Sequence, residues 1–262
     1  MTAVATKTVE VAAGVIEYLE AGAGEPIVFF HGGGGPEAKA RFIPDLAQRY
    51  RVLAPARPGY NSSTGRGDTP REAAETMAAF IQAAVSGPVH LIAESAGGAP
   101  ACWLAILHPE LLQSLILAAP AAFAGHGPAR EGPPPAPATP QEMERRLFGD
   151  HPAWAAPLTA EDLAQRQRNV QANMARMRPA HANGDLLERL HDIATPTLVL
   201  WGTADEVIAP EQSQIYDKHI PHVHRLYLYG AAHALPVSAC DRFIRLATDF
   251  IERGDAFVVN KR

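Results

Sequence analysis

One serine of this 262-residue chain stands at a corner that suits a nucleophile. Ser95 follows the branched apolar run 89–93, which predicts a buried strand, and precedes the helix formers of 99–107. Ala93 and Gly97 are small enough to fit beside so tight a strand-to-helix turn. Such a corner strains the serine backbone, pushes its side chain out of the sheet and places it at a helix N-terminus, which favours developing negative charge. An ordinary loop serine is the alternative at this point.

A run of four glycines is the second feature with chemical potential. Residues 31–36 read His-Gly-Gly-Gly-Gly-Pro and follow the apolar run 26–30, which is typical of a strand buried on both faces. Glycine lets the backbone approach another group closely. A phosphate-binding loop is disfavoured because no Lys-Ser or Lys-Thr pair follows, and the context of a dinucleotide loop is missing. A flexible connector is the alternative, and His31 is expected to hydrogen-bond to the loop backbone.

Residues 93–97 resemble the nucleophile elbow of the α/β-hydrolase family, a small-x-nucleophile-x-small pattern, with alanine where the first glycine is more usual. The resemblance implies that Ser95 is the nucleophile. It also implies an oxyanion hole made of two backbone N–H groups. One is that of Ala96 and the other that of Gly33 in the His-Gly-Gly segment, with Gly34 as the competing donor.

Two further stretches resemble the acid and base positions of the family. The loop after the predicted strand 195–201 reads Gly-Thr-Ala-Asp and ends in Asp205, with Glu206 as the adjacent alternative. His233 comes just past the last predicted strand, 224–229. The resemblance implies that Asp205 holds His233 in one tautomer and that His233 accepts the serine proton. The chain order serine, aspartate, histidine is that of this fold. A helix-capping aspartate and a structural histidine are the alternatives.

Strands and helices alternate around these motifs. Predicted strands lie at residues 6–11, 15–19, 26–30, 51–54, 89–93, 112–118, 195–201 and 224–229. Predicted helices lie at 38–50, 70–85, 99–107, 210–219 and 241–251. Thr69 is the expected N-cap of the second helix, with proline at its first position. The resemblance implies an α/β-hydrolase fold, with a mostly parallel eight-stranded-type sheet flanked by helices and a helical cap insertion.

The alternation of strand and helix stops after residue 120. Residues 127–140 are rich in proline, and helical patterns follow at 141–147 and 161–177 without a strand signal. A long helical insertion here resembles the cap of many family members. It implies a core of residues 1–120 and 193–262 and a cap of residues 121–192. Four large apolar residues are candidates for the substrate pocket: Phe123, Trp154, Met174 and Met177. The alternative is that they pack within the cap's own core.

Composition excludes several classes of protein. Apolar residues make up 47% of the chain and charged residues 19%, which is typical of a globular α/β domain with a sizeable core. The formal net charge is -5 and basic residues form no run, so no nucleic-acid partner is expected. The 2 cysteines are too few for a disulfide framework. Without an apolar run of spanning length or an N-terminal secretory pattern, we expect a cytoplasmic protein with no membrane partner.

Three histidines lie close enough together in the sequence to be candidate metal ligands. His219, His222 and His224 straddle a predicted helix end, a proline turn and a strand start, with no acidic ligand in register. No metal is therefore predicted. The family resemblance implies no organic cofactor either, and the oligomeric state is left open.

The motifs together resemble a serine hydrolase over nearly the whole chain. The resemblance implies acyl transfer through an acyl-enzyme on a small-molecule substrate, with a small to medium carboxylic ester or a lactone preferred. A serine nucleophile disfavours the dehalogenase and epoxide hydrolase branches, which use a carboxylate. Two alternatives stay open. One is hydrolysis of a carbon–carbon bond in a dienoic or diketone compound, and the other is a ligand-binding receptor on the same fold.

Overall fold

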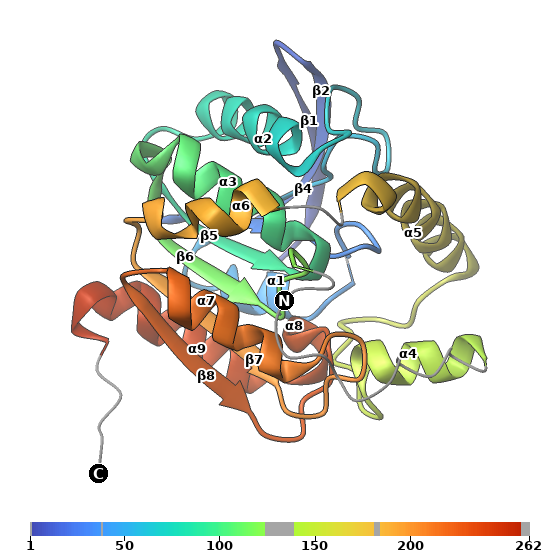
Figure 1. Ribbon diagram of the computed structural model, residues 1–262. Coiled ribbons are helices and arrows are strands. Elements are labelled where there is room, and N and C mark those ends of the chain that lie inside the picture. The colour runs from blue at the N-terminus through green and yellow to red at the C-terminus, as the bar shows by residue number, and fades with distance from the viewer. Residues whose placement is uncertain (1, 38, 124–138, 181–183, 258–262) are drawn as a thin grey trace.

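An eight-stranded sheet forms the centre of the structure, a computed structural model that describes residues 2–37, 39–123, 139–180 and 184–257 (Figure 1). In sheet order the strands are β1 (Ala5–Val11), β2 (Gly14–Ala21), β4 (Arg51–Pro55), β3 (Pro26–Phe30), β5 (Val89–Glu94), β6 (Leu112–Ala118), β7 (Thr197–Gly202) and β8 (Val223–Leu228). The pairings of β2 with β1 and β4 are antiparallel, and those from β4 to β8 are parallel. The sheet confirms the predicted fold class.

Helices cover both faces of the sheet, as its apolar strands require. Strands β3, β5, β6 and β7 are buried along almost their whole length, as in other parallel sheets with helices on both sides. One face packs against α2 (Pro70–Ala84), α3 (Gly98–Leu107), α6 (Gly184–Arg189) and α7 (Ser213–His219). The other packs against α1 (Phe42–Leu46), α8 (Leu235–Ser238) and α9 (Cys240–Arg253). Each face therefore has an apolar core of its own.

Helix α2 begins where the sequence predicts. The Thr69 side-chain oxygen accepts a hydrogen bond from the Glu72 N–H at 3.2 Å, and the Glu72 carboxylate accepts one from the Thr69 N–H at 3.3 Å. This capping box satisfies two N–H groups that would otherwise lack a partner at the helix start. The predicted N-cap is thus confirmed.

The helix predicted over residues 38–50 is wrong in its extent, because the structure has only the short α1 in this region. The backbone before α1 is used elsewhere. Ala40 forms a bridge with Trp154, and the Arg41 N–H donates to the Ala153 carbonyl at 3.1 Å. The Lys39 carbonyl accepts from the Ala155 N–H at 2.7 Å and is not used by the Ile43 N–H, as it would be in an α-helix that includes residue 39, so the helix begins after Arg41.

Two helices stand beyond one end of the sheet. Helices α4 (Pro140–Phe148) and α5 (Ala160–Ala180) come between β6 and β7 in the chain. In Figure 1 they lie beyond the ends to which the arrows of β5 and β6 point. Open α/β sheets bind their ligands outside the carboxyl ends of the strands. Helices α4 and α5 are therefore next to the place where this architecture holds a ligand.

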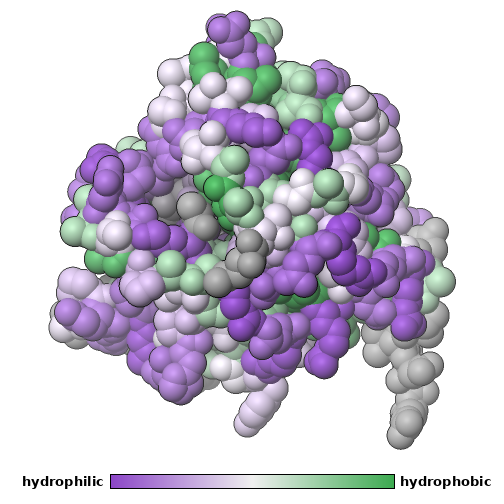
Figure 2. All heavy atoms as spheres, turned by 180° about the vertical axis from the view of Figure 1, so that it is seen from behind, coloured by the Kyte–Doolittle hydropathy of each residue, from purple (hydrophilic) through white to green (hydrophobic). Residues whose placement is uncertain are grey.

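The surface seen in Figure 2 is mainly polar. Among its coloured residues, the hydrophobic ones form small separate groups between hydrophilic ones. Within the described ranges, no helix is long and apolar enough to cross a bilayer. Most of the large apolar side chains are instead buried in the two cores.

The turn from β5 into α3 brings two backbones into contact. Ser95 has a φ of 47° there, in the left-handed region that residues other than glycine rarely adopt. A β-carbon on Gly97 would lie 2.5 Å from the Phe30 carbonyl oxygen and 2.9 Å from that of His31. Only glycine allows so close an approach. Glycine is therefore needed at position 97 because the backbone at the end of β3 leaves no room for a β-carbon.

We predict that Gly97→Ala destabilises the protein by about 1–3 kcal/mol, the usual cost of forcing an extra group into a packed site. Gly97 has a φ of -75°, which alanine adopts freely, so the cost comes from collision with the carbonyls. Gly87→Ala is the control, because Gly87 has a φ of 88° and open space around it and so tests backbone strain alone. Urea unfolding measures both variants. An unchanged midpoint for Gly97→Ala would contradict the close approach.

Candidate active site

Three side chains from three strand ends meet at one edge of the sheet. His233 Nε2 lies 2.8 Å from Ser95 Oγ, and His233 Nδ1 lies 2.8 Å from Asp205 Oδ2. Ser95 directly follows β5, while Asp205 and His233 lie in the loops after β7 and β8. Asp205 is 3% and His233 1% exposed, whereas Ser95 stays partly open to solvent. The structure thus brings together the three residues that the motifs single out and leaves the serine accessible.

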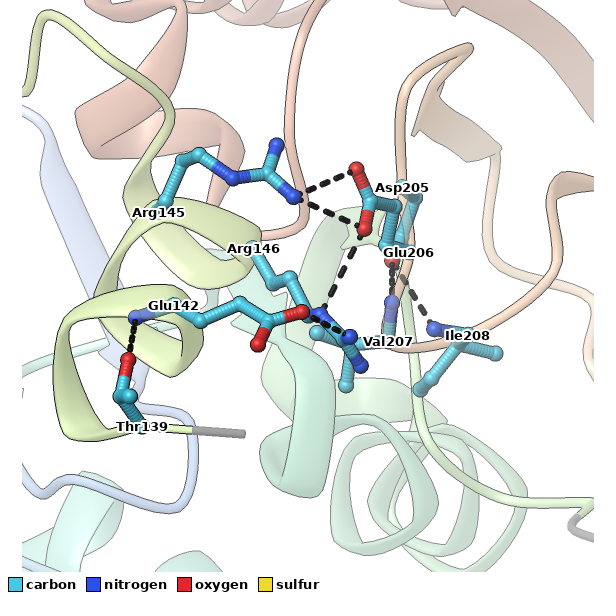
Figure 3. Close-up of polar contacts among 8 residues, drawn as sticks. All are labelled: Thr139, Glu142, Arg145, Arg146, Asp205, Glu206, Val207 and Ile208. Atoms are coloured by element: carbon cyan, nitrogen blue, oxygen red, sulfur yellow. Dashed lines mark hydrogen bonds and ion pairs between the residues drawn. The ribbon is translucent and has the colours of Figure 1, made fainter. Parts of the chain in front are cut away.

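Asp205 is held by its own loop. Its Oδ1 accepts hydrogen bonds from the N–H groups of Val207 and Ile208, at 2.8 and 2.9 Å (Figure 3). Its Oδ2 is directed to the His233 ring. Because both oxygens have partners and the carboxylate is buried, Asp205 is placed to orient the imidazole and to stabilise a positive charge on it.

Glu206, the neighbouring acid, is bound by two arginines of helix α4. Its carboxylate lies 3.0 Å from Nη2 of Arg145 and forms an ion pair with Arg146, both on α4 (Figure 3). The Arg146 carbonyl in turn accepts a hydrogen bond from the His233 N–H at 3.4 Å. Helix α4 is thereby tied to the loop of Asp205 through side chains and to the loop of His233 through the backbone.

The protonation of His233 follows from its surroundings. Burial by itself lowers the pKa of the ring, but the charge and hydrogen bond of Asp205 outweigh it and leave the pKa of His233 above its ordinary value. When Nδ1–H donates to Asp205, Nε2 presents its lone pair to the Ser95 hydroxyl. The arrangement can therefore take a proton from Ser95 and hold it.

The glycine-rich loop after β3 passes beside the serine. A β-carbon on Gly32 would lie 3.4 Å from Ser95 Cβ. Gly33, the predicted donor of this loop, and Gly34, its competitor, lie against α5. A β-carbon on Gly33 would lie 3.0 Å from Asn173 Nδ2, and one on Gly34 would lie 3.2 Å from Arg166 Cγ. The loop is thus enclosed between the turn after β5 and helix α5, while the role of its N–H groups stays a prediction.

His31 opens this loop and hydrogen-bonds to its backbone, as the sequence predicts. Its Nδ1 donates to the Gly32 carbonyl at 2.6 Å, and its Nε2 accepts from the Arg57 N–H at 3.0 Å. Burial, together with the charge of Arg57, lowers the pKa of His31 well below its ordinary value. The ring is therefore neutral, with its donor and its acceptor both engaged.

Glu94 is a titratable group of the site that the motif does not reveal. Its carboxyl carbon would lie 3.7 Å from a β-carbon on Gly32, so the side chain turns toward the glycine loop beside Ser95. Burial raises the pKa of Glu94 to about 7, with the charge of Glu37 adding to the effect and that of His233 opposing it. Near neutral pH this carboxyl is divided between its charged and neutral forms. Its position directly before the serine is the only sequence signal that points to it.

Helix α5 turns a polar row toward the core. Its members recur at helical spacing: Arg166, Asn169 and Asn173. The Arg166 guanidinium pairs with Glu37 at 2.7 Å, and the Asn169 amide donates to the Gly34 carbonyl at 2.8 Å. Asn173 Oδ1 accepts from the Tyr60 hydroxyl at 2.7 Å. The row fastens α5 to the glycine loop and to the turn after β4, and no sequence motif singles out Asn169 or Asn173.

The four candidate pocket residues lie in different surroundings. Phe123 is buried, with its ring centre 5.5 Å from that of Tyr216. The Trp154 ring packs on Phe148 with centres 5.1 Å apart. Met174 is 64% exposed on α5, and the side chain of Met177 lies outside the described residues. Phe123 and Trp154 therefore contribute to packing in this structure.

The histidine cluster does not form a metal site in the described residues. His219 ends α7, and the His224 ring packs against the rings of Phe250 and Phe257. Throughout the described part of the chain, no three histidine, cysteine, aspartate or glutamate side chains are grouped so that they could hold a metal ion.

Comparison with known proteins finds relatives over most of the chain. The family model described as "Alpha/beta hydrolase family" matches residues 27–246. The chain is 37% identical over 108 residues to a 2-hydroxy-6-oxo-6-(2'-aminophenyl)hexa-2,4-dienoic acid hydrolase of Metapseudomonas resinovorans, which is 38% of this chain and 37% of that protein. It is 27% identical over 249 residues to a pimeloyl-acyl-carrier-protein methyl ester esterase of Aeromonas hydrophila, which is 88% of this chain and 96% of that protein.

Solved structures share the fold. A serine hydrolase involved in carbazole degradation superimposes with a TM-score of 0.76 at 22% identity, over 95% of this chain and 99% of that one. A bacterial membrane phospholipase A, described as a virulence factor, superimposes with a TM-score of 0.77 at 23% identity, over 97% of this chain and 87% of that one.

We predict that Glu94→Gln stabilises the protein at alkaline pH. In the unfolded chain the ordinary pKa of 4.5 applies, whereas the folded value is about 7. Between these values unfolding releases a proton, so the free energy of unfolding of the wild type falls as pH rises through this window. Removing the titratable group should therefore raise the free energy of unfolding by about 1–3 kcal/mol near pH 8, with a smaller gain near pH 5.

Urea unfolding at a series of pH values measures this gain. Glu10→Gln is the matched control, because Glu10 is an exposed glutamate on β1. The control should show no comparable pH dependence. A gain for Glu94→Gln that stays constant between acid and alkaline pH would mean that this carboxyl does not titrate in the folded protein as described.

Proposed function

The chain belongs to the alpha/beta hydrolase family, and from this membership we propose that it is a serine hydrolase with a Ser-His-Asp triad and an acyl-enzyme intermediate. Ser95 is the nucleophile, His233 the general base and Asp205 the residue that orients the base. The observation that carries the proposal is the pair of hydrogen bonds, each 2.8 Å, that joins Asp205 to His233 and His233 to Ser95.

In the first half of the proposed reaction, a bond forms between Ser95 Oγ and the substrate carbonyl carbon. Oγ gives its proton to His233 Nε2, and the carbonyl π electrons move onto the carbonyl oxygen. The Asp205 carboxylate stabilises the imidazolium, in agreement with the raised pKa of His233. The N–H groups of Ala96 and Gly33 receive the oxyanion, and the start of the helical segment after β5 favours the same charge.

The second half releases the product and restores the side chains. The intermediate collapses as the bond to the leaving oxygen breaks and that oxygen takes the proton from His233. Water then gives a proton to the same ring nitrogen while its oxygen attacks the acyl carbon. Ser95 Oγ leaves with that proton, and the net reaction adds one water across the cleaved bond.

A small to medium carboxylic ester or a lactone is the proposed substrate class. The esterase of Aeromonas hydrophila, which aligns with 88% of the chain, favours an ester. In this proposal residues 1–120 and 193–262 form the catalytic core, and residues 121–192 form a cap. Because α4 contacts the loop of Glu206 and α5 contacts the loop of Gly34, these helices border the approach to Ser95.

Hydrolysis of a carbon–carbon bond is the second candidate function. The observation that favours it is the group of relatives named as dienoate hydrolases, one of which is 27% identical over 91% of this chain. Such a reaction would use the same serine and histidine. A panel of esters and lactones beside 6-oxo-dienoates separates the two candidates, because one set of substrates is turned over faster than the other.

We expect a fluorophosphonate to modify the wild type once, at Ser95, and to leave Ser95→Ala unmodified. Only an activated serine attacks the phosphorus, and intact-mass spectrometry detects the adduct. Turnover of the best substrate should fall by about a million-fold in Ser95→Ala, as when a triad serine is lost. Ser114→Ala is the control, because Ser114 Oγ also lies 2.8 Å from a histidine nitrogen, Nδ1 of His90. Unlike Ser95, Ser114 is buried within strand β6 and does not stand at a strand-to-helix turn. Undiminished turnover in Ser95→Ala would contradict the assignment of Ser95 as the nucleophile.

Replacing each neighbouring acid separates their roles. Asp205→Asn should lower kcat by about ten-thousandfold, because the amide favours the wrong tautomer of His233. Glu206→Gln should lower it by less than about tenfold, because Glu206 faces the arginines of α4. Steady-state kinetics on one substrate measures both. The reverse order of losses would show that Glu206 is the acid.

A further inference from the structure

The direction of the two assigned N–H groups depends on the carbonyls behind them. A trans peptide group is planar, and its C=O points opposite to its N–H. The Gly33 N–H shares a peptide group with the Gly32 carbonyl, and the Ala96 N–H shares one with the Ser95 carbonyl. Hydrogen-bond donors that fix these two carbonyls therefore also fix the directions of the Gly33 and Ala96 N–H groups.

Both carbonyls are bound by donors. The Ser95 oxygen accepts from the Ala121 N–H at 2.7 Å. The Gly32 oxygen accepts from His31 Nδ1 at 2.6 Å, from Arg57 Nη2 at 3.4 Å and from the Gly35 N–H at 3.4 Å. Such donors also polarise the peptide group and so strengthen its N–H as a donor. The side chains behind the loop thus bear on its capacity to bind an oxyanion.

The Arg57 guanidinium joins the two halves of this arrangement. Its Nη1 donates to the Ala96 carbonyl at 3.0 Å, in the turn after β5. Its Nη2 donates to the His31 carbonyl at 3.0 Å, in the loop after β3. The side chain comes from the turn after β4, is 6% exposed and has its guanidinium carbon 4.9 Å from the centre of the Tyr60 ring. The planar guanidinium therefore joins the loops after β3 and β5, and the turn after β4, which carries Arg57 and Tyr60, holds it in place.

We propose that Arg57 is a positioning residue, which holds the loops after β3 and β5 so that the N–H groups of Gly33 and Ala96 converge on one oxygen. This inference rests on the proposed function, because an oxyanion forms only if Ser95 attacks a carbonyl. A guanidinium suits this role because its N–H groups lie in one plane and diverge, so that they can bind two loops at once. A guanidinium also keeps its positive charge throughout the pH range in which proteins work. The same positive charge favours negative charge that develops nearby.

Arg57→Lys is the central test, because lysine keeps the charge but has a compact ammonium that cannot span two loops. Arg57→Met removes the charge as well. Arg71→Met is the matched control, because Arg71 stacks on the Trp103 ring at 5.3 Å in a similar way but is exposed on α2. Thermal unfolding shows whether each variant is folded. If Arg57→Met fails to fold, the comparison of Arg57→Lys with the wild type decides.

The measurements are the rate of phosphonylation by a fluorophosphonate, kcat and KM on the best substrate, and the affinities of two inhibitors. A boronic acid forms a tetrahedral adduct with the serine, whereas an ether analogue of the substrate has no carbonyl oxygen to stabilise. For Arg57→Lys we expect phosphonylation and kcat to fall by about 10- to 100-fold, less than for direct loss of an oxyanion donor. Boronic acid binding should weaken in parallel, with KM and ether binding within about twofold of the wild type.

Each result has a distinct meaning. A wild type that the fluorophosphonate does not label overturns the proposed function, and this inference with it. A labelled wild type with Arg57→Lys labelled at the same rate overturns this inference alone. Equal weakening of boronic acid and ether binding would make Arg57 a structural residue only, which also overturns it.

Discussion

The close approach of the loops after β3 and β5 is the constraint on which the site depends. Gly97 lies so near the Phe30 and His31 carbonyls that no side chain fits between them, and this contact sets the glycine loop beside Ser95. Ser95 adopts a left-handed backbone to make the turn. Strain of about 1–3 kcal/mol persists only where the surroundings over-determine a residue. Here β5, α3 and the hydrogen bond from Ala121 to the Ser95 carbonyl do so.

Helices α4 and α5 are joined to the core in different ways: α4 places Phe148 in an apolar core, whereas α5 is held by charged and polar contacts. Arg145 pairs with Glu206, and Lys39 pairs with Asp162 at 2.6 Å. Ion pairs with partly exposed partners contribute only about 0–1 kcal/mol each, whereas the sheet lies between two apolar cores. Such exposed pairs therefore hold α5 less strongly than the apolar cores hold the sheet.

Burial acts on three titratable groups around the serine, and their partners decide the outcome. His31 has the charge of Arg57 nearby and is neutral. His233 has the Asp205 carboxylate, so its pKa is raised despite burial. For Glu94, the charge of His233 lowers the pKa by less than burial raises it, so the pKa is about 7. Near neutral pH, a neutral His31, a neutral form of Glu94 and a stabilised His233 imidazolium are therefore all accessible around Ser95.

Local patterns in the sequence were enough to predict the mostly parallel sheet and the placement of Ser95, Asp205 and His233 after strands, because apolar runs mark buried strands and small residues mark tight turns. Parallel strand ends meet at one edge, which is why these residues lie close together. The shortened helix α1 and the role of Arg57 depend on partners far away in the chain, so no local pattern could reveal them. Which of Asp205 and Glu206 lies beside the imidazole likewise depends on tertiary structure. Both carboxylates fit the motif, and only the arginines of α4, which bind Glu206, and the backbone N–H groups that turn Asp205 toward the imidazole distinguish them.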